Sequence, residues 1–109
     1  MAESNEENRK SDIKPRYDLI PPELLEGTAT ILTLSEDKHK DNSWELGNMT
    51  WGQHFSALMR HLWKWWSPLH PDTDDETGRS HLWHAASRIG FLIAYEVRGI
   101  GIDDRNKRV

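Results

Sequence analysis

Hydrophobic and polar positions recur with a helical period in three segments of this chain. We predict helices over residues 22–38, 50–66 and 77–98, the last ending at Gly99, a common helix stop. The second helix is the most amphipathic, and its apolar stripe consists of Phe55, Leu58, Met59, Leu62 and Trp66. No segment shows the period-two alternation of a strand. The predicted fold is therefore all-α, with three main helices.

Polar and charged residues dominate both ends of the chain. Residues 1–13 contain almost nothing to bury and are predicted to form a disordered arm, and residues 106–109 a loose tail. Residues 14–105 remain as a single helical domain. A domain of this size buries only a thin core, too thin to enclose every tryptophan of the second and third helices. We therefore expect homo-oligomerisation, as a homodimer or larger, to complete the bundle through Trp63, Trp65, Trp66 and Trp83.

Charge and composition exclude several classes of function. The chain has 109 residues and a formal net charge of −4 at pH 7, which disfavours binding to long nucleic acids or anionic lipids. It has no cysteine, so disulfides and thiolate metal sites are excluded. No apolar run approaches the roughly 20 residues of a membrane-spanning helix, and the first ten residues lack the apolar core of a signal peptide. We expect a soluble, cytoplasmic protein without a membrane partner.

The third predicted helix carries an unusual polar stripe. A step of about 100° per residue places His81, His84 and Arg88 on one side, where two imidazoles and a guanidinium suit a phosphate group or a metal ion with an anionic ligand. His61 lies beside the apolar stripe of the second helix and can face the third. The acidic loop of residues 72–76 leads directly into His81, so carboxylates join the imidazoles if the loop folds back. Such mixed donors favour Mn²⁺ or Zn²⁺.

Simpler interpretations remain open at this point. A pair of histidines three residues apart is usually not a metal site, and an acidic run is usually a solvated turn with favourable charge at a helix N-terminus. Thr77 or Ser80 could act as an N-cap and nothing more. The tryptophans are most simply explained as core or subunit-interface residues.

Four stretches of the chain carry a resemblance to a known family. They are "KPRYDLIPPELLEGTATILTLSEDKHKDNSWELG", "FSALMRHLWKWW", "DTDDETGRSHLWHAASRIGFLIAYEVRG" and "GIDDR", which together cover about residues 13–105. In this order and spacing they resemble the phage-type dATP/dGTP diphosphohydrolase family, which is similar to MazG-like nucleotide pyrophosphohydrolases. The resemblance implies an all-α fold that assembles through helix pairing. It also implies metal-dependent cleavage of a deoxypurine triphosphate between its α- and β-phosphates, in the host cytoplasm if a phage encodes the chain.

The resemblance further implies roles for residues at matching positions. A divalent metal ion (Mg²⁺, Mn²⁺ or Zn²⁺) would be held by His61, Asp74, Glu76, His81 and His84. Asp74 and Glu76 would also be the catalytic carboxylates that orient or deprotonate the attacking water. The basic residues expected at the phosphates are Lys14, Arg16, Arg60 and Lys64, together with Arg88 from the polar stripe. Trp44 or Trp65 would stack on the purine.

The chain also departs from the family pattern. Pro71 stands where the family has a glutamate, and proline can neither bind a metal nor act as a base; Ser43 replaces an asparagine before Trp44. A family member that lost turnover but still sequesters a purine or signalling nucleotide, as a phage anti-defence protein, is therefore an alternative function. A third is a small interaction module that docks on another protein through its tryptophans.

Overall fold

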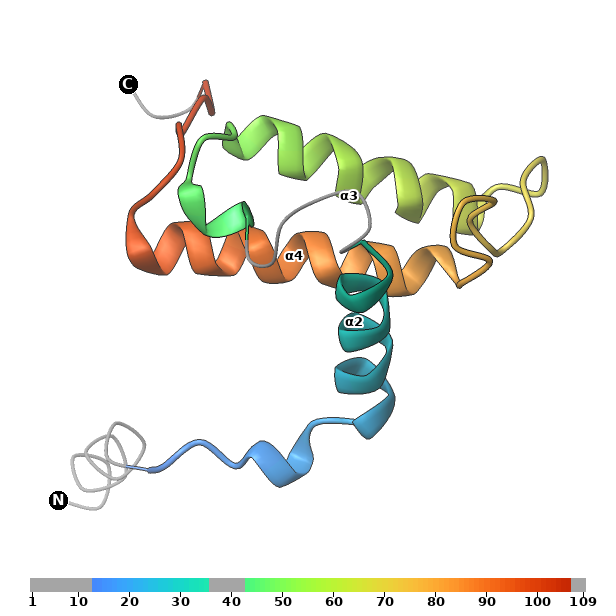
Figure 1. The fold of residues 1–109 in the computed structure, drawn as a ribbon, viewed down its shortest axis with the longest axis horizontal. Coiled ribbons are helices and arrows are strands. Elements are labelled where there is room, and N and C mark those ends of the chain that lie inside the picture. The colour runs from blue at the N-terminus through green and yellow to red at the C-terminus, as the bar shows by residue number, and fades with distance from the viewer. Residues whose placement is uncertain (1–12, 36–42, 107–109) are drawn as a thin grey trace, which may run out of the picture.

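The computed structural model describes residues 13–35 and 43–106. Its elements are η1 (Tyr17–Leu19), α2 (Pro22–Leu34), η3 (Ser43–Leu46), α3 (Trp51–Trp66) and α4 (His81–Arg98). The helices α3 and α4 lie side by side, and α2 packs crosswise against α4 (Figure 1). This confirms the all-α prediction with three main helices. Most of the predicted arm, the last residues of the predicted tail and the predicted end of the first helix at residue 38 lie outside the described residues.

Local hydrogen bonds set the ends of α3 and α4. A capping box starts α3, because the Thr50 hydroxyl accepts the N–H of Gln53 while the Gln53 side chain accepts the N–H of Thr50. The Ser80 hydroxyl accepts the N–H of Leu82 and starts α4, four residues later than the predicted start at residue 77. The helix ends as predicted at Gly99, whose φ of 65° is left-handed.

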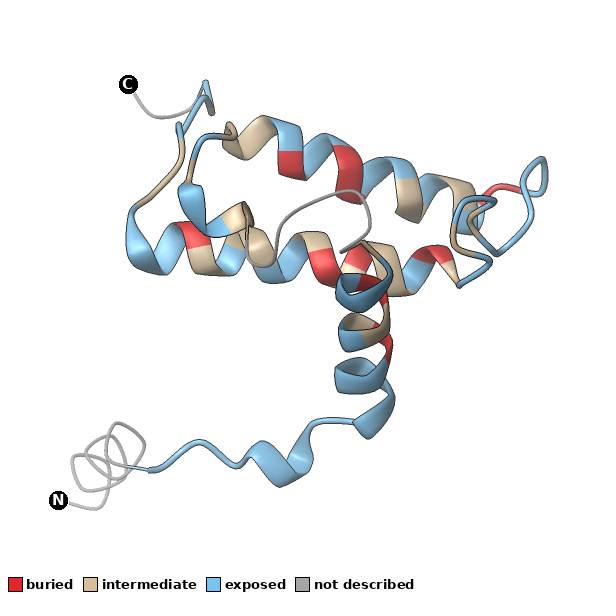
Figure 2. Ribbon diagram, viewed as in Figure 1, coloured by how far each residue is buried: buried red, intermediate tan, exposed pale blue. Residues whose placement is uncertain are grey.

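The core is small, and its buried residues lie mainly on α3 and α4, with others on α2, as Figure 2 shows. Its buried apolar residues are Ile31, Ala57, Leu58, Ala85 and Tyr95, and its buried polar residues are His54, Ser67, His81 and Ser87. Within the apolar stripe predicted for α3, Leu58 is buried, whereas Phe55 and Trp66 are 54% and 74% exposed. The two helices therefore meet through a face rich in histidine, and much of the apolar stripe stays on the surface.

A close approach holds α2 against α4. Gly27 is buried, and a Cβ added there would lie 2.9 Å from two ring atoms of Trp83. Only a residue without a side chain allows this helix to come so near the indole. The contact fixes α2 near the N-terminal half of α4.

The segment after α4 returns to the start of α3. The Trp51 indole Nε1 donates to the carbonyl of Ile100, and the Trp51 N–H donates to the carbonyl of Ile102, both at 2.9 Å. An Asp104 carboxylate oxygen accepts the N–H of Gly52 at 2.8 Å. These bonds tie the first turn of α3 to the end of α4. No helix in the described part of the chain combines the length and apolarity needed to cross a bilayer.

Candidate metal centre

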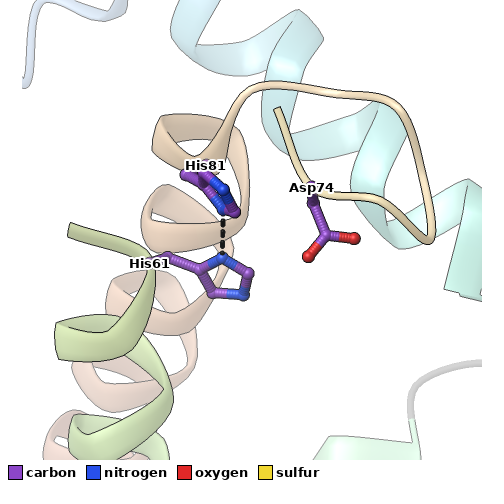
Figure 3. A group of neighbouring side chains, drawn as sticks. All are labelled: His61, Asp74 and His81. Carbon is purple, nitrogen blue, oxygen red and sulfur yellow. Dashed lines mark hydrogen bonds between the residues drawn. The ribbon is translucent and has the colours of Figure 1, made fainter. Parts of the chain in front are cut away.

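Three side chains from different segments converge at one end of the α3–α4 pair. His61 comes from the C-terminal half of α3, His81 is the first residue of α4, and Asp74 belongs to the turn that joins the helices. One donor atom from each residue lies within 4.8 Å of the other two (Figure 3). The Nδ1 atoms of His61 and His81 are 3.0 Å apart. His81 is only 3% exposed, whereas His61 and Asp74 are half-buried, so the group is partly recessed.

The turn before α4 folds because of the sequence "TDDETGRS". One oxygen of Asp74 accepts the backbone N–H groups of Glu76, at 2.9 Å, and Thr77, at 3.2 Å, which makes an Asx turn. The N–H of Gly78 donates to the Asp74 carbonyl at 2.7 Å, and Gly78 has the left-handed φ of 68° that favours glycine. An isolated β-bridge closes the turn between Thr73 and Ser80. The turn thereby holds the Asp74 carboxylate near the imidazoles.

The environment keeps these groups in the forms that bind metal. Burial, followed by the neighbouring His84 and His81, lowers the pKa of His61 to about 4. Burial also lowers the pKa of His84. For Asp74, burial acts to raise the pKa, but the N–H groups of Glu76 and Thr77 and the nearby His84 and His61 lower it overall. At neutral pH, His61 is therefore a neutral imidazole and Asp74 a carboxylate.

The two imidazoles have the spacing of ligands on a single metal ion. Two nitrogens bound to an ion at about 2.1 Å stand about 3.0 Å apart at a right angle and about 3.4 Å apart in a tetrahedron, close to the spacing between His61 and His81. Without an ion, the same contact is a hydrogen bond from one imidazole to the other. Imidazole suits Zn²⁺, Mn²⁺, Co²⁺ or Ni²⁺, whereas Mg²⁺ prefers oxygen ligands. The group His61, Asp74 and His81 could therefore hold a divalent ion.

His84 lies beside this group, not within it. Its ring stacks on His61 with centroids 4.5 Å apart and an interplanar angle of 11°. Its Nε2 lies 2.8 Å from the Thr77 hydroxyl and 3.9 Å from an Asp74 oxygen. His84 and Thr77 thus support the rings and the turn. For Thr77 the sequence suggested only an N-cap, although the D-x-x-T-G spacing of an Asx turn is a signal for its place in the turn.

The second acidic candidate, Glu76, lies on the same turn as Asp74. Glu76 is exposed and is not one of the three clustered residues. Its backbone N–H donates to the Asp74 carboxylate. The structure therefore brings Asp74 to the imidazoles and leaves Glu76 two residues away on the same turn.

The basic residues expected to contact the phosphates lie in two different parts of the structure. Arg60 and Arg88 line a common cleft of about 470 Å³ on the α3–α4 pair, and Lys64 is half-buried near His61. Lys14 and Arg16 lie on the exposed N-terminal segment, which projects away from α3 and α4 (Figure 1). Arg16 forms an ion pair with Asp18 at 2.7 Å.

Sequence reasoning missed the histidine that holds Arg88. His54 is fully buried, and its Nδ1 accepts a hydrogen bond from the Arg88 guanidinium at 3.1 Å. The same residue has its ring edge-on to Tyr95, with centroids 4.7 Å apart. The position of His54 seven residues before His61 was visible in the sequence, but its partner on α4 was not.

The two tryptophans expected to stack on the purine base, Trp44 and Trp65, have different neighbours. Trp44 stacks on Phe91 at 5.2 Å, and the guanidinium of Arg98 lies 4.9 Å from the centre of its ring. Trp65 contacts Trp66 and is 38% exposed. Trp44 is half-buried, whereas Trp65 is exposed.

Comparison with known families supports the resemblance found in the motifs. The family model described as dATP/dGTP diphosphohydrolase, N-terminal, matches residues 4–105. The chain belongs to this family. No curated protein and no solved structure matches it. Membership in the dATP/dGTP diphosphohydrolase family implies a nucleotide substrate, and the group of His61, Asp74 and His81 could hold a metal ion.

Proposed function

We propose that this chain hydrolyses dATP or dGTP to the deoxynucleoside monophosphate and pyrophosphate, with a divalent ion held by His61, Asp74 and His81. The observation that carries the proposal is the convergence of these three donors in a chain that belongs to a diphosphohydrolase family. The neutral state of His61 at pH 7 and the ionised state of Asp74 support metal binding at the pH of a cell.

The chemistry assigns a task to each group. A bound divalent ion neutralises phosphate charge and lowers the pKa of water. The water oxygen bonds to the α-phosphorus, the bond from that phosphorus to the oxygen bridging the β-phosphate breaks, and pyrophosphate leaves with that oxygen. Asp74 faces the imidazoles and orients the water, and Glu76, two residues along the same turn, accepts its proton. His84 holds His61 in place by stacking.

Pyrophosphate release tests this function directly. Purified protein is incubated with dATP or dGTP and Mg²⁺, Mn²⁺, Co²⁺ or Zn²⁺, and the monophosphate and pyrophosphate are measured by anion-exchange chromatography. We expect activity with at least one transition metal, and a loss of about 100-fold or more in His61→Asn and Asp74→Asn, because each removes a ligand or an orienting group. His70→Asn is the matched control, since His70 is exposed and outside the group. If His61→Asn and Asp74→Asn are as active as His70→Asn and the wild type, this site does not carry the reaction.

Nucleotide sequestration is the second candidate function. Pro71 is exposed in the turn at the place of the family's glutamate, and Glu76 lies outside the clustered donors, so the described site offers a single clustered carboxylate. A site with fewer carboxylates loses turnover before it loses binding. Recovery of unhydrolysed dGTP from the washed protein, with no pyrophosphate in any metal, would favour sequestration over hydrolysis.

We also propose that the chain assembles as a homodimer or larger homo-oligomer. The stripe of α3 that faces away from α4 exposes Phe55, Met59, Trp63 and Trp66, by 44% to 74%. Such a continuous apolar surface is unusual on a monomer. We assign the purine to the neighbourhood of Trp65, near the same end of α3 as His61.

A further inference from the structure

Residues 13–26, which we call the projecting segment, leave their apolar side chains exposed. The segment comprises η1 and the first residues of α2, and it leads from α4 away from α3 (Figure 1). All of its residues are exposed, and buried residues of α2 begin only at Gly27. Its large apolar side chains are 46% to 75% exposed and belong to Ile13, Tyr17, Leu19, Ile20, Leu24 and Leu25. So much exposed apolar surface in one segment indicates a contact with another molecule.

The projecting segment has a regular local structure, although α3 and α4 do not cover it. The Arg16 guanidinium donates to both carboxylate oxygens of Asp18, at 2.8 Å and 2.7 Å. The N–H of Leu19 donates to the carbonyl of Arg16, and two prolines restrict the backbone at the start of α2. A segment whose conformation is set in advance loses less freedom when it binds.

The same chain has a second exposed apolar surface on α3. Phe55, Met59, Trp63 and Trp66, which we call the α3 stripe, are 44% to 74% exposed. The projecting segment does not cover the α3 stripe of its own chain, because α2 packs against α4 and leads away from α3 (Figure 1). A second copy of the chain can therefore supply the partner that each of the two surfaces needs.

The charges beside the two surfaces are opposite. The charged residues of α2 are both acidic, Glu23 and Glu26, and they flank the two exposed leucines of this helix. Apart from its histidines, the charged residues of α3 are both basic, Arg60 and Lys64, and each directly follows a residue of the α3 stripe. Opposite charges favour contact between α2 and α3, whereas two copies of α3 would bring like charges together.

The exposed surface is large enough for a stable interface. Six large side chains with this exposure offer on the order of 700 Å², which approaches the roughly 800 Å² that each partner contributes to a standard interface. In a symmetric pair the segment of each copy meets the α3 stripe of the other, so the contact forms twice. Such a reciprocal arrangement is closed and leaves neither surface uncovered.

We propose that the projecting segment docks on the α3 stripe of a second copy, in a reciprocal exchange between the two chains. This inference rests on the proposed homo-oligomer and names the segment that forms it. The exposed leucines of α2 meet the aromatic side chains of the stripe. Glu23 and Glu26 then lie near the basic residues of the partner's helix.

Cysteine crosslinking tests the arrangement, because the chain has no cysteine of its own. Leu25→Cys and Met59→Cys chains with different tags are co-expressed, purified and oxidised, and the products are separated on a non-reducing gel. We expect the mixed product of the two chains to dominate. Leu69→Cys in place of Met59→Cys should give little mixed product, since Leu69 is 86% exposed and lies off the stripe. If Met59→Cys links only to itself, or no mixed product forms, the inference is wrong.

Light scattering coupled to size exclusion separates this inference from the homo-oligomer itself. Leu19→Ser combined with Leu25→Ser should raise the dissociation constant by about tenfold or more. Leu46→Ser, at a comparably exposed position on η3, should change it by less than about twofold. If Trp63→Glu dissociates the oligomer and the double variant does not, the oligomer stands and the projecting segment is not its contact. A wild type that is monomeric at all concentrations would overturn both proposals.

Discussion

Buried histidines distinguish this chain at the scale of single residues. The pKa values of His54, His61 and His84 are all lowered, in each case first by burial. A positive Arg88 adds to the effect at His54, and the other imidazoles add to it at His61. Protonation of these buried or partly buried rings is therefore unfavourable in the folded chain, and acid should act on the fold through them.

The free energy of unfolding should depend on pH through His61. Its pKa is about 4 in the folded chain and about 6.5 when unfolded, so the unfolded chain binds more protons between these values. Stability is then complete above about pH 6.5 and falls as the pH drops toward 4, by about 2 kcal/mol between pH 7 and pH 5 for this residue. Urea denaturation of the metal-free protein at both pH values measures the loss. His61→Asn should reduce it and His70→Asn should not; an unchanged loss in His61→Asn would contradict the assignment.

The sequence predicted which residues of one helix lie on the same side, but not which residues of different segments meet. The helical period placed His81, His84 and Arg88 on one stripe, because the angle between residues of a helix depends only on their spacing. The pairing of Arg88 with His54 depends on how α4 is rotated against α3, which no local pattern contains. The choice of Asp74 over Glu76 for the cluster depends on an Asx turn, in which the side chain competes with the helix for backbone N–H groups.

At the scale of elements, packing of α2 depends on one glycine. Gly27 allows the backbone of α2 to approach the Trp83 ring, whereas Gly90, within α4, has no neighbour within 4 Å of the place where a Cβ would lie. Both residues lie inside helices, where alanine is intrinsically better than glycine by up to about 1 kcal/mol. The two positions therefore separate helix propensity from the contact between helices.

Alanine should have opposite effects at the two glycines. Gly27→Ala should lower the free energy of unfolding by about 1–3 kcal/mol, because its Cβ overlaps the indole of Trp83. Gly90→Ala should raise it by about 0.5–1 kcal/mol. Chemical denaturation of both variants beside the wild type checks the signs. A stabilised Gly27→Ala would mean that α2 does not pack on Trp83 as described.

The helices themselves were largely predictable, since their periodicity and caps are local. The late start of α4 was not, because Ser80 and the closed turn of residues 72–80 replaced the expected first turn. Which partner buries the apolar face of a helix was also not predictable. An apolar stripe on α3 indicates a buried surface, but whether it is buried by α4 or by another chain is a tertiary question.

At the scale of the whole molecule, both main helices carry apolar side chains that face outward. On α4 these are Leu82, Ile89, Ile93 and Val97, which are 38% to 79% exposed, and on α3 they include Met59 and Trp63. Burial of apolar surface is worth about 25 cal/mol per Å², so covering these side chains favours association strongly. The proposed homo-oligomer is the assembly that would cover them.

Light scattering coupled to size exclusion tests this assembly. The wild type should elute as a dimer or larger species, and Trp63→Glu or Met59→Glu should shift it toward the monomer, because a charge is buried without a partner. Leu69→Glu is the control, since Leu69 is 86% exposed in the loop after α3 and lies off the stripe. A wild type that is monomeric at all concentrations, and captures a different protein through the stripe, would instead support an interaction module.

Removal of the metal provides a further test. At a free ion concentration of 100 times the Kd, binding to the folded chain alone adds about 2.7 kcal/mol to the free energy of unfolding. EDTA should therefore lower the melting temperature of the wild type, measured by scanning calorimetry, and leave that of His61→Asn unchanged. If EDTA lowers the melting temperatures of the wild type and His61→Asn equally, the ion binds at another site.

The turn that presents Asp74 has a consequence for the lifetime of the protein. A single ion at His61, Asp74 and His81 would link the C-terminal half of α3, the connecting turn and the first residue of α4. A chain synthesised under metal starvation would lack this link and would open more often, which would expose the turn to proteases. The cellular abundance of the protein would then depend on the supply of its ion. A shortage of the ion would lower both the amount of protein and its activity.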